Sequence, residues 1–236
     1  APGNPERMIE ANDGGATVSV NGGKSWTDLD VPTAQFYHVF LTAHVPYQIC
    51  GAQQDNSTAC ISSSPSRGFG QGEYFYPVGG GESGYIAPDP LNPNIVYASG
   101  NGILKISFPS EQYINVSPAQ DPALKLRTSS AQPLIWAPWN KRELLAGFQY
   151  VMQTTDGGVH WKKISPEFGL ARGADTTAVL NISGADPRPV GAIENISPST
   201  LAAGTIWVST NSGYIHLTRD HGATWKDVSI PGLPTP

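Results

Sequence analysis

The chain has 236 residues, of which 26 are Gly and 21 are Pro, and its 14 basic and 19 acidic residues give a formal net charge of −5. The 6 Trp, 9 Tyr and 7 Phe exclude a disordered chain, and the Gly residues lack the three-residue period of collagen. The sequence has no basic face for nucleic acid, and no apolar run approaches the roughly 18 residues of a membrane-spanning helix. We therefore expect a turn-rich, all-β globular protein with no nucleic-acid partner and no transmembrane segment.

Residues 6–30 are predicted to form part of a β-sheet, with strands at Met8–Glu10, Ala16–Val20 and Trp26–Leu29. The segment Ser19–Trp26 joins the last two strands and has the pattern Ser/Thr-x-Asp/Asn-x-Gly-x-x-Trp. In such a turn the Asn or Asp bonds to backbone amides, the Gly takes a positive φ, and the hydroxyl ties the strand end to the turn. The Trp ring is then available to pack on neighbouring elements, so we assign this segment a structural role.

Residues 35–78 are predicted to form a second unit, with strands near Tyr37–Leu41, Gln48–Ala52 and Ala59–Ser63 and a fourth at Tyr74–Val78. Its two cysteines, Cys50 and Cys60, flank a segment that is expected to be a hairpin loop, Gly51–Ala59. A disulfide across this loop is possible and would indicate an oxidising compartment, while two buried free thiols are equally compatible with the spacing. With no other Cys and five scattered His, we expect no metal site and no cofactor.

The densest polar cluster of the chain is in the same unit. Its residues are Gln53, Gln54, Asp55 and Asn56, and His38 is on the strand before them. These side chains could bind a sugar or a peptide backbone, but an Asx-type turn and a rim histidine are the alternative interpretation. No catalytic residue is expected; Asp55 and Glu82 are weak candidates, and Glu82 follows the flexible Gly79–Gly81 segment as a solvated loop residue would.

Three further units, at residues 83–117, 133–166 and 191–230, each hold four short predicted strands. The last two repeat the octapeptide, so that the three copies consist of Ser19, Asn21, Gly23 and Trp26; Thr154, Asp156, Gly158 and Trp161; and Thr218, Asp220, Gly222 and Trp225. Four-stranded units repeating every ~50–60 residues are typical of β-propeller blades. The sequence thus predicts an all-β propeller, or a partial one, of about four to five four-stranded antiparallel blades.

We expect residues 1–236 to form one propeller segment with blades at 6–30 (partial), 35–78, 83–117, 133–166 and 191–230. The chain begins Ala1-Pro2-Gly3 without an initiator Met, as expected for a mature or excised segment. Four and a half blades favour a piece of a larger propeller protein.

The octapeptide resembles the Asp-box, or BNR repeat, of sialidases, sortilin-type receptors and xyloglucan-cleaving glycosidases. Nearly the whole chain is similar to the large secreted bacterial sortilin-like or glycosyl-hydrolase-like BNR-repeat proteins. The segments that carry this likeness are Pro32–His38, Gly51–Asn56, Asp89–Tyr97, Thr155–Pro166 and Gly204–Gly213. The resemblance implies an extracytoplasmic protein, periplasmic or secreted, that lies within a much longer polypeptide.

The function that we expect is non-catalytic binding or scaffolding, in which the propeller docks a protein partner or a polysaccharide, as a subunit of a larger assembly or with the rest of a larger propeller. The alternative is a glycoside hydrolase related to xyloglucanases, which needs two carboxylates that face each other across a cleft. The candidate carboxylates carry no distinguishing motif.

Overall fold

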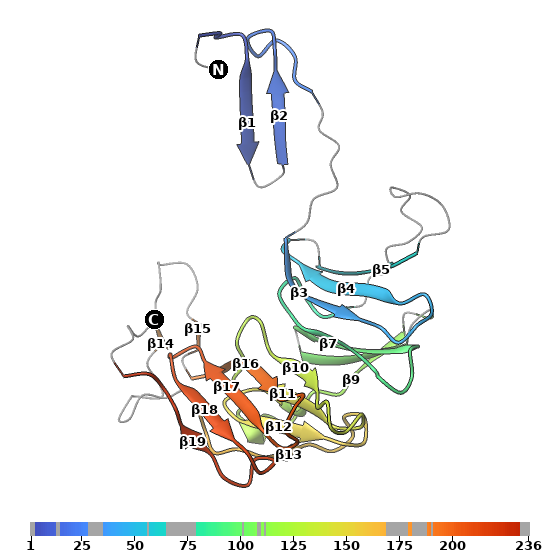
Figure 1. Cartoon of the computed structure of the whole chain (residues 1–236), viewed down its shortest axis with the longest axis vertical. Coiled ribbons are helices and arrows are strands. Elements are labelled where there is room, and N and C mark those ends of the chain that lie inside the picture. The colour runs from blue at the N-terminus through green and yellow to red at the C-terminus, as the bar shows by residue number, and fades with distance from the viewer. Residues whose placement is uncertain are drawn as a thin grey trace. The chain divides into compact units, whose positions relative to one another are not determined.

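The computed structural model describes residues 3–12, 15–27, 35–55, 57–64, 79–100, 102–107, 110, 112–168, 179–180, 188–189 and 191–231 (Figure 1). The chain divides into two compact units, Ala1–Gln35 and Phe36–Pro236. Among the described residues, no helix has the length and apolar character needed to cross a membrane.

The first unit is a β-hairpin. Strand β1 (Met8–Asn12) pairs antiparallel with β2 (Gly15–Ser19), in a register that sets Met8 opposite Ser19. The turn after β2 returns the chain so that Thr27 bridges Val18. The unit therefore contains two full strands and the start of a third.

The second unit has four antiparallel sheets arranged as the blades of a β-propeller, which follow one another along a curved path in Figure 1. Blade I contains β3 (Phe36–Leu41), β4 (Gln48–Gln53) and β5 (Ser57–Ser62). Blade II contains β6 (Ile86–Pro88), β7 (Ile95–Gly100), β8 (Gly102–Ser107) and β9 (Gln112–Asn115). Blade III contains β10 (Leu134–Trp136), β11 (Leu144–Gly147), β12 (Val151–Thr154) and β13 (Lys162–Lys163). Blade IV contains β16 (Ile193–Pro198), β17 (Ile206–Thr210), β18 (Ile215–Thr218) and β19 (Lys226–Asp227).

Short elements connect the blades. Two 3-10 turns, η2 (Pro118–Gln120) and η3 (Pro122–Leu124), lie between blades II and III. Each is capped by a side chain, since Ser117 Oγ accepts from Ala119 N and Asp121 Oδ1 accepts from Ala123 N. A two-stranded pair, β14 (Val179–Leu180) with β15 (Arg188–Pro189), lies between blades III and IV.

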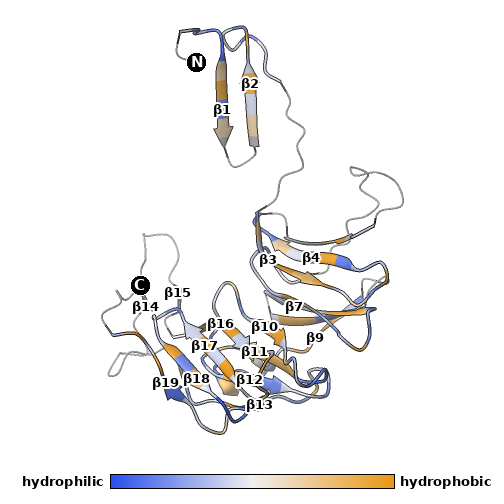
Figure 2. Cartoon of the chain, viewed as in Figure 1, coloured by the Kyte–Doolittle hydropathy of each residue, from blue (hydrophilic) through white to orange (hydrophobic). Residues whose placement is uncertain are grey.

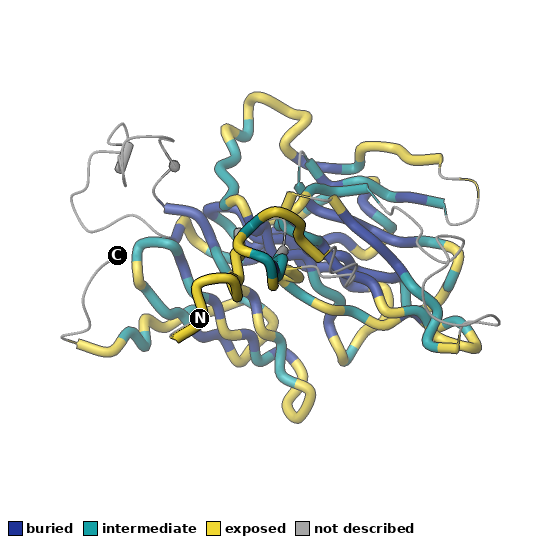
Figure 3. The backbone as a smooth tube through the Cα atoms, turned by 90° about the horizontal axis from the view of Figure 1, so that it is seen from above, coloured by how far each residue is buried: buried dark blue, intermediate teal, exposed yellow. Residues whose placement is uncertain are grey.

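The core lies between consecutive blades, because the inner and middle strands carry apolar residues on both faces. Blades I and II bury Cys50, Cys60, Ile86, Val96, Ala98 and Ile106 between them. The equivalent layers are Tyr97, Ile103, Leu144 and Met152 between blades II and III, and Leu145, Val151, Ile206 and Val208 between blades III and IV. Figure 2 shows hydrophobic residues along β3 and β7, and Figure 3 shows buried backbone through the middle of the second unit. The outer strands β9, β13 and β19 are exposed along their whole length.

The predicted all-β propeller fold of antiparallel blades is confirmed. The loop expected at Gly51–Ala59 is wrong, because β4 continues to Gln53 and β5 begins at Ser57, so Cys50 and Cys60 pair within the ladder. The strands run past the cysteines because small and apolar residues on either side, Ala52 and Ala59 among them, are buried in the blade. The proposed fourth strand at 74–78 lies outside the described residues.

Candidate functional site

The polar cluster that the sequence singled out lies at the turn between β4 and β5. Gln53 ends β4, Asp55 takes a positive φ of 60° in the turn, and Ser57, the first residue of β5, takes a positive φ of 62°. Asn56, the fourth predicted residue, lies outside the described residues. An Asp tolerates this left-handed conformation better than most residues, which explains why the polar run forms a tight turn.

Four side chains meet at this turn, those of Tyr37, Gln54, Asp55 and Glu82. The hydroxyl of Tyr37, on β3, donates to Gln54 Oε1, and Gln54 Nε2 donates to Asp55 Oδ1 at 3.2 Å. The backbone N–H of Asp55 donates to Glu82 Oε2 at 2.8 Å. The two weak catalytic candidates, Asp55 and Glu82, are therefore neighbours, and the Glu82 carboxylate closes the turn of blade I from the segment that leads into blade II.

His38 lies next to this turn, on β3. Its half-buried ring packs on Tyr85 with ring centroids 4.0 Å apart, and burial lowers the pKa of His38. Tyr85 is itself buried, and both its burial and the negative charge of Glu194 raise its pKa to about 12. Glu194 belongs to β16 of blade IV and acts on Tyr85 through its charge.

Sequence reasoning missed Tyr37 and Tyr85. Tyr37 was inside a predicted strand directly before His38, and alternation along the strand could have placed it beside the polar turn. Tyr85 had no local signal, because it meets His38 only where the start of β6 packs beside β3. Tyr37, His38, the Gln54 amide and the carboxylates of Asp55 and Glu82 thus lie at the rim of blades I and II, around the turn between β4 and β5. The exposed ring of Tyr37 can stack on an uncharged ligand, and the polar groups can hydrogen-bond to it.

A second polar cluster joins blade III to the segment before blade IV. Arg127 Nη2 contacts Glu167 Oε1 at 2.5 Å and donates to the carbonyl of Gly191 at 3.3 Å. Tyr150 Oη donates to Glu167 Oε2 at 3.1 Å, and Lys163 Nζ lies 4.1 Å above the Tyr150 ring. The Arg127 hydrogen bond is the main reason that the pKa of Glu167 is lowered. This cluster uses its charges to hold segments of chain together.

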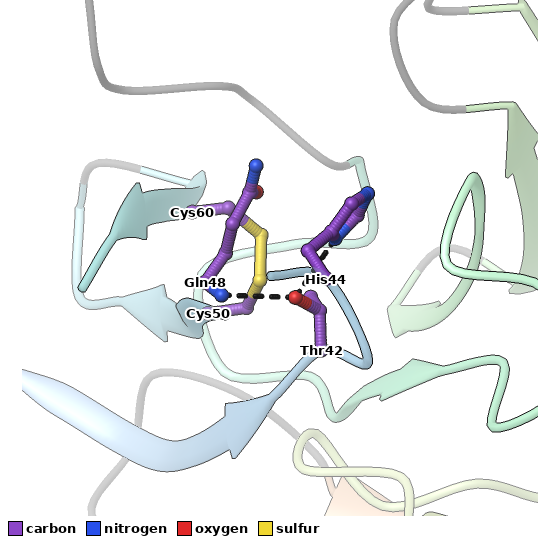
Figure 4. The surroundings of a disulfide bond; sticks show 5 residues. All are labelled: Thr42, His44, Gln48, Cys50 and Cys60. Carbon is purple, nitrogen blue, oxygen red and sulfur yellow. Dashed lines mark hydrogen bonds between the residues drawn. A yellow bond between two sulfur atoms is a disulfide. The ribbon is translucent and has the colours of Figure 1, made fainter. Parts of the chain in front are cut away.

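The two cysteines form a disulfide between directly opposite residues of β4 and β5. Figure 4 shows the polar contacts beside it: Thr42 Oγ1 accepts from the backbone N–H of Gln48 at 2.9 Å and lies 2.9 Å from His44 Nδ1. Of the two alternatives for Cys50 and Cys60, the structure therefore has the bonded one. Within the described ranges, no group of three or more His, Cys, Asp or Glu residues could hold a metal ion.

The three octapeptides close their turns with the same hydrogen bonds. The hydroxyls of Ser19, Thr154 and Thr218 accept from the N–H of Gly23, Gly158 and Gly222 at 2.9–3.0 Å. The oxygens of Asn21, Asp156 and Asp220 accept from the N–H four residues later at 2.9–3.0 Å. These bonds lower the pKa of Asp156, chiefly through the His160 N–H, and that of Asp220 to about 2, chiefly through the Thr224 hydroxyl.

The tryptophans of the second and third copies join neighbouring blades. Trp161 Nε1 donates to the carbonyl of Val116 at the end of blade II, and Trp225 Nε1 donates to the carbonyl of Ile164 at the end of blade III, both at 2.8 Å. An open pocket of about 510 Å³ lies at the second joint, with Lys162, Ile164, His221 and Trp225 in its lining. These residues link blades, and the described catalytic and binding candidates lie elsewhere.

No family model matches the chain, and no curated protein matches it. Among solved structures, it is similar to a Niastella koreensis GH74 enzyme, at 14% identity over 83% of this chain and 30% of that one, with a TM-score of 0.50. It is also similar to the Xanthomonas campestris GH74 xyloglucanase, at 15% identity over 94% of this chain and 36% of that one, with a TM-score of 0.49. A third similar structure is YCF48 bound to D1 peptide, at 10% identity over 94% of this chain and 64% of that one, with a TM-score of 0.43. The chain spans about a third of the length of the two GH74 proteins. At this level of identity, the likeness to the Niastella enzyme shows the fold alone, a β-propeller.

Proposed function

We propose that this chain is a non-catalytic, extracytoplasmic binding propeller of the Asp-box type. It docks a protein partner or a polysaccharide at the rim of blades I and II. The observation that carries the proposal is the convergence of Tyr37, Gln54, Asp55 and Glu82 on one turn, beside the packed rings of His38 and Tyr85.

The chemistry of the rim supports a ligand without formal charge. Aromatic faces stack on sugar rings or peptide planes, and an amide side chain offers both a donor and an acceptor. Burial lowers the pKa of His38 and so favours its uncharged form. The Glu82 carboxylate accepts a backbone N–H and so acts as part of the support for the turn.

The pKa values of the Asp156, Glu167 and Asp220 carboxyls are shifted downwards by hydrogen bonds that hold the structure together, which fits a structural role for these three residues. The disulfide supports a location in an oxidising compartment.

The proposal is tested by measuring both binding and turnover with the same protein. The chain is applied to a glycan array and to a peptide array, and it is incubated with xyloglucan in a reducing-sugar assay. We expect binding on one array that Tyr37→Ala weakens by about tenfold, a loss of one stacked ring and one hydrogen bond. Tyr113→Ala, an exposed tyrosine on β9, is the matched control and leaves binding unchanged.

Turnover of xyloglucan would overturn the non-catalytic assignment and establish the glycoside hydrolase alternative. Binding that responds equally to Tyr37→Ala and Tyr113→Ala would move the site away from the rim of blades I and II.

A further inference from the structure

The pocket between blades III and IV has two walls that come from different blades. One wall is β13 with the segment that follows it, residues 162–166, and the other is formed by His221, Gly222, Ala223 and Trp225 of the octapeptide turn in blade IV. The hydrogen bond from Trp225 Nε1 to the carbonyl of residue 164 holds the two walls together. The volume of about 510 Å³ lies within the range of ligand sites, roughly 300–1,000 Å³.

The lining of this pocket is basic. Its described residues include Lys162, Lys163 and His221 and contain no Asp or Glu. The Lys163 ammonium is already engaged, since it lies 4.1 Å from the centroid of the Tyr150 ring. The Lys162 ammonium forms no ion pair within the described ranges. Lys162 therefore brings a positive charge to the pocket that the packing of the blades does not use.

The strand register directs the side chain of Lys162 towards blade IV. Lys162 lies opposite Gln153, and Gln153 lies opposite Leu145. Leu145 is fully buried in the layer between blades III and IV. Because directly opposite residues share a face of the sheet, Lys162 leaves β13 on the side of the blade that carries His221.

His221 is held in place at the opposite wall. Its backbone has a positive φ of 57°, and its N–H donates to the carbonyl of Gly204 at 3.0 Å. Its ring packs edge-on against Trp139, with ring centroids 5.5 Å apart. A Cβ on Gly204 would lie 2.6 Å from His221 Cδ2, so glycine at position 204 leaves the room that the ring needs. The imidazole is thus positioned at an exposed site, where a ring N–H can donate to a ligand.

The carboxylates on the surrounding elements are already hydrogen-bonded to other groups. The buried carboxylate of Glu143 accepts one indole N–H and one amide N–H, at 3.1 and 2.8 Å. Asp220 accepts from the two threonine hydroxyls of its own turn. Glu167 pairs with Arg127. None of the three forms an ion pair with Lys162, so the pocket keeps its positive charge.

We propose that this pocket binds a sugar acid, a uronate residue of an acidic polysaccharide, whose carboxylate contacts Lys162 and His221 while its ring lies on Trp225. A carboxylate held by an ammonium and a ring N–H forms charge-assisted hydrogen bonds, which are stronger than neutral ones. The indole N–H of Trp225 is already bonded within the protein, so Trp225 offers a ligand its apolar surface.

A uronate carries its carboxylate directly on a rigid ring, so one compact unit satisfies both walls of the pocket. An Asp or Glu side chain of a peptide would supply the charge without a ring for Trp225. This site is separate from the rim of blades I and II, and it does not depend on the ligand proposed for that rim.

The first test measures the binding of three acidic trimers, of galacturonate, mannuronate and guluronate, to the full chain by isothermal titration calorimetry. We expect at least one trimer to bind, and its methyl ester to bind about tenfold more weakly, because the ester lacks the charge that Lys162 pairs with. Added salt should weaken the binding of the acid, because it screens exposed charges. If none of the acids binds, or if acid and ester bind equally, the proposal is wrong.

The second test locates the bound acid with lysine variants. Lys162→Gln is expected to weaken binding about tenfold, and Lys162→Arg, which keeps the charge, is expected to retain it. Lys226→Gln is the matched control, since Lys226 is an exposed lysine on β19 outside the pocket lining, and it should leave binding unchanged. The chain carries a net charge of −5, so its overall charge does not attract an anion. Equal losses in Lys162→Gln and Lys226→Gln would overturn the assignment to this pocket.

Two further outcomes would also overturn the inference. Binding of the acid that is lost in Tyr37→Ala and kept in Lys162→Gln would place the sugar at the rim of blades I and II, which supports the proposed function and not this site. A poly-Glu peptide that binds through Lys162 more tightly than every acidic trimer would show that the pocket takes an acidic peptide.

Discussion

The indole N–H of Trp161 lies 2.8 Å from the carbonyl oxygen of Val116, and this contact joins the octapeptide of blade III to the last strand of blade II. A buried carbonyl without a donor is costly, so the bond stabilises the interface and not only the turn. The same relation between Trp225 and Ile164 shows that the octapeptides of blades III and IV join neighbouring blades.

Trp161→Phe is expected to lower the free energy of unfolding by about 1 kcal/mol, because it removes this hydrogen bond while keeping most of the packed ring. Urea denaturation followed by circular dichroism measures the change. Trp26→Phe is the matched variant, since the Trp26 side chain is 42% exposed, and it should change the free energy of unfolding by less than about 0.5 kcal/mol. Equal effects of the two variants would contradict the interblade role.

Gly158→Ala is expected to lower the free energy of unfolding more than Gly23→Ala does. Both glycines have positive φ, 90° and 83°, so the backbone strain of a Cβ is shared. Only at Gly158 would the Cβ meet the preceding blade, 2.8 Å from the side chain of Val116. We expect an additional loss of about 1–3 kcal/mol at Gly158 from this overpacking. Hydrogen exchange resolved by residue measures the loss of stability in the hairpin and in the blades separately. Similar losses of stability for the two variants would show that backbone strain alone is responsible.

The octapeptide turn that contains Asp220 should keep its carboxylate hydrogen bonds at moderately acidic pH. The pKa of Asp220 is lowered from 3.8 to about 2, chiefly by the Thr224 hydroxyl and the Thr224 N–H. Because the folded pKa lies below the unfolded one, its contribution to stability is complete above pH ~4 and is lost as pH falls from about 3.8 through 2. Carboxyl ¹³C NMR titration should place the midpoint of Asp220 well below 3.8. Thr224→Val should move the midpoint upwards, and an unchanged midpoint would show that the hydroxyl is not the cause.

Removal of the disulfide is expected to destabilise blade I in particular. The bond closes a short loop between Cys50 and Cys60, and the chain-entropy account assigns such a loop about 2–3 kcal/mol. The variant Cys50→Ala with Cys60→Ala avoids leaving a free thiol. Native-state hydrogen exchange should show faster opening of β4 and β5 while β11 and β12 keep their protection. Uniform acceleration throughout the second unit would mean that the blades open together.

The side chains around the turn between β4 and β5 could be predicted only in part from the local sequence. Gln53, Gln54 and Asp55 stood out as part of the densest polar cluster of the chain, a run of four residues that ends with Asn56, and Asp55 does lie in a turn after β4. Tyr85 was not predicted, because its contact with His38 depends on the angle at which blade II packs on blade I. Such angles are determined by side-chain packing between sheets, which no pattern along one strand reports.

The sequence by itself determined the strand pattern of a blade and the hydrogen-bonded octapeptide turn within it. Alternating strands, the spacing of Thr154, Asp156, Gly158 and Trp161, and the return of this spacing at Thr218–Trp225 are local features, and local hydrogen bonds realise them. Only the tertiary structure decided what the side chains of Trp161 and Trp225 bind, which faces of the blades are buried, and which face, like that of Trp207, is exposed. The physical reason is that a face of a blade is buried only when a second surface packs against it. The residues along a blade are the same with or without a neighbouring blade, so only the packed structure shows whether the face is covered.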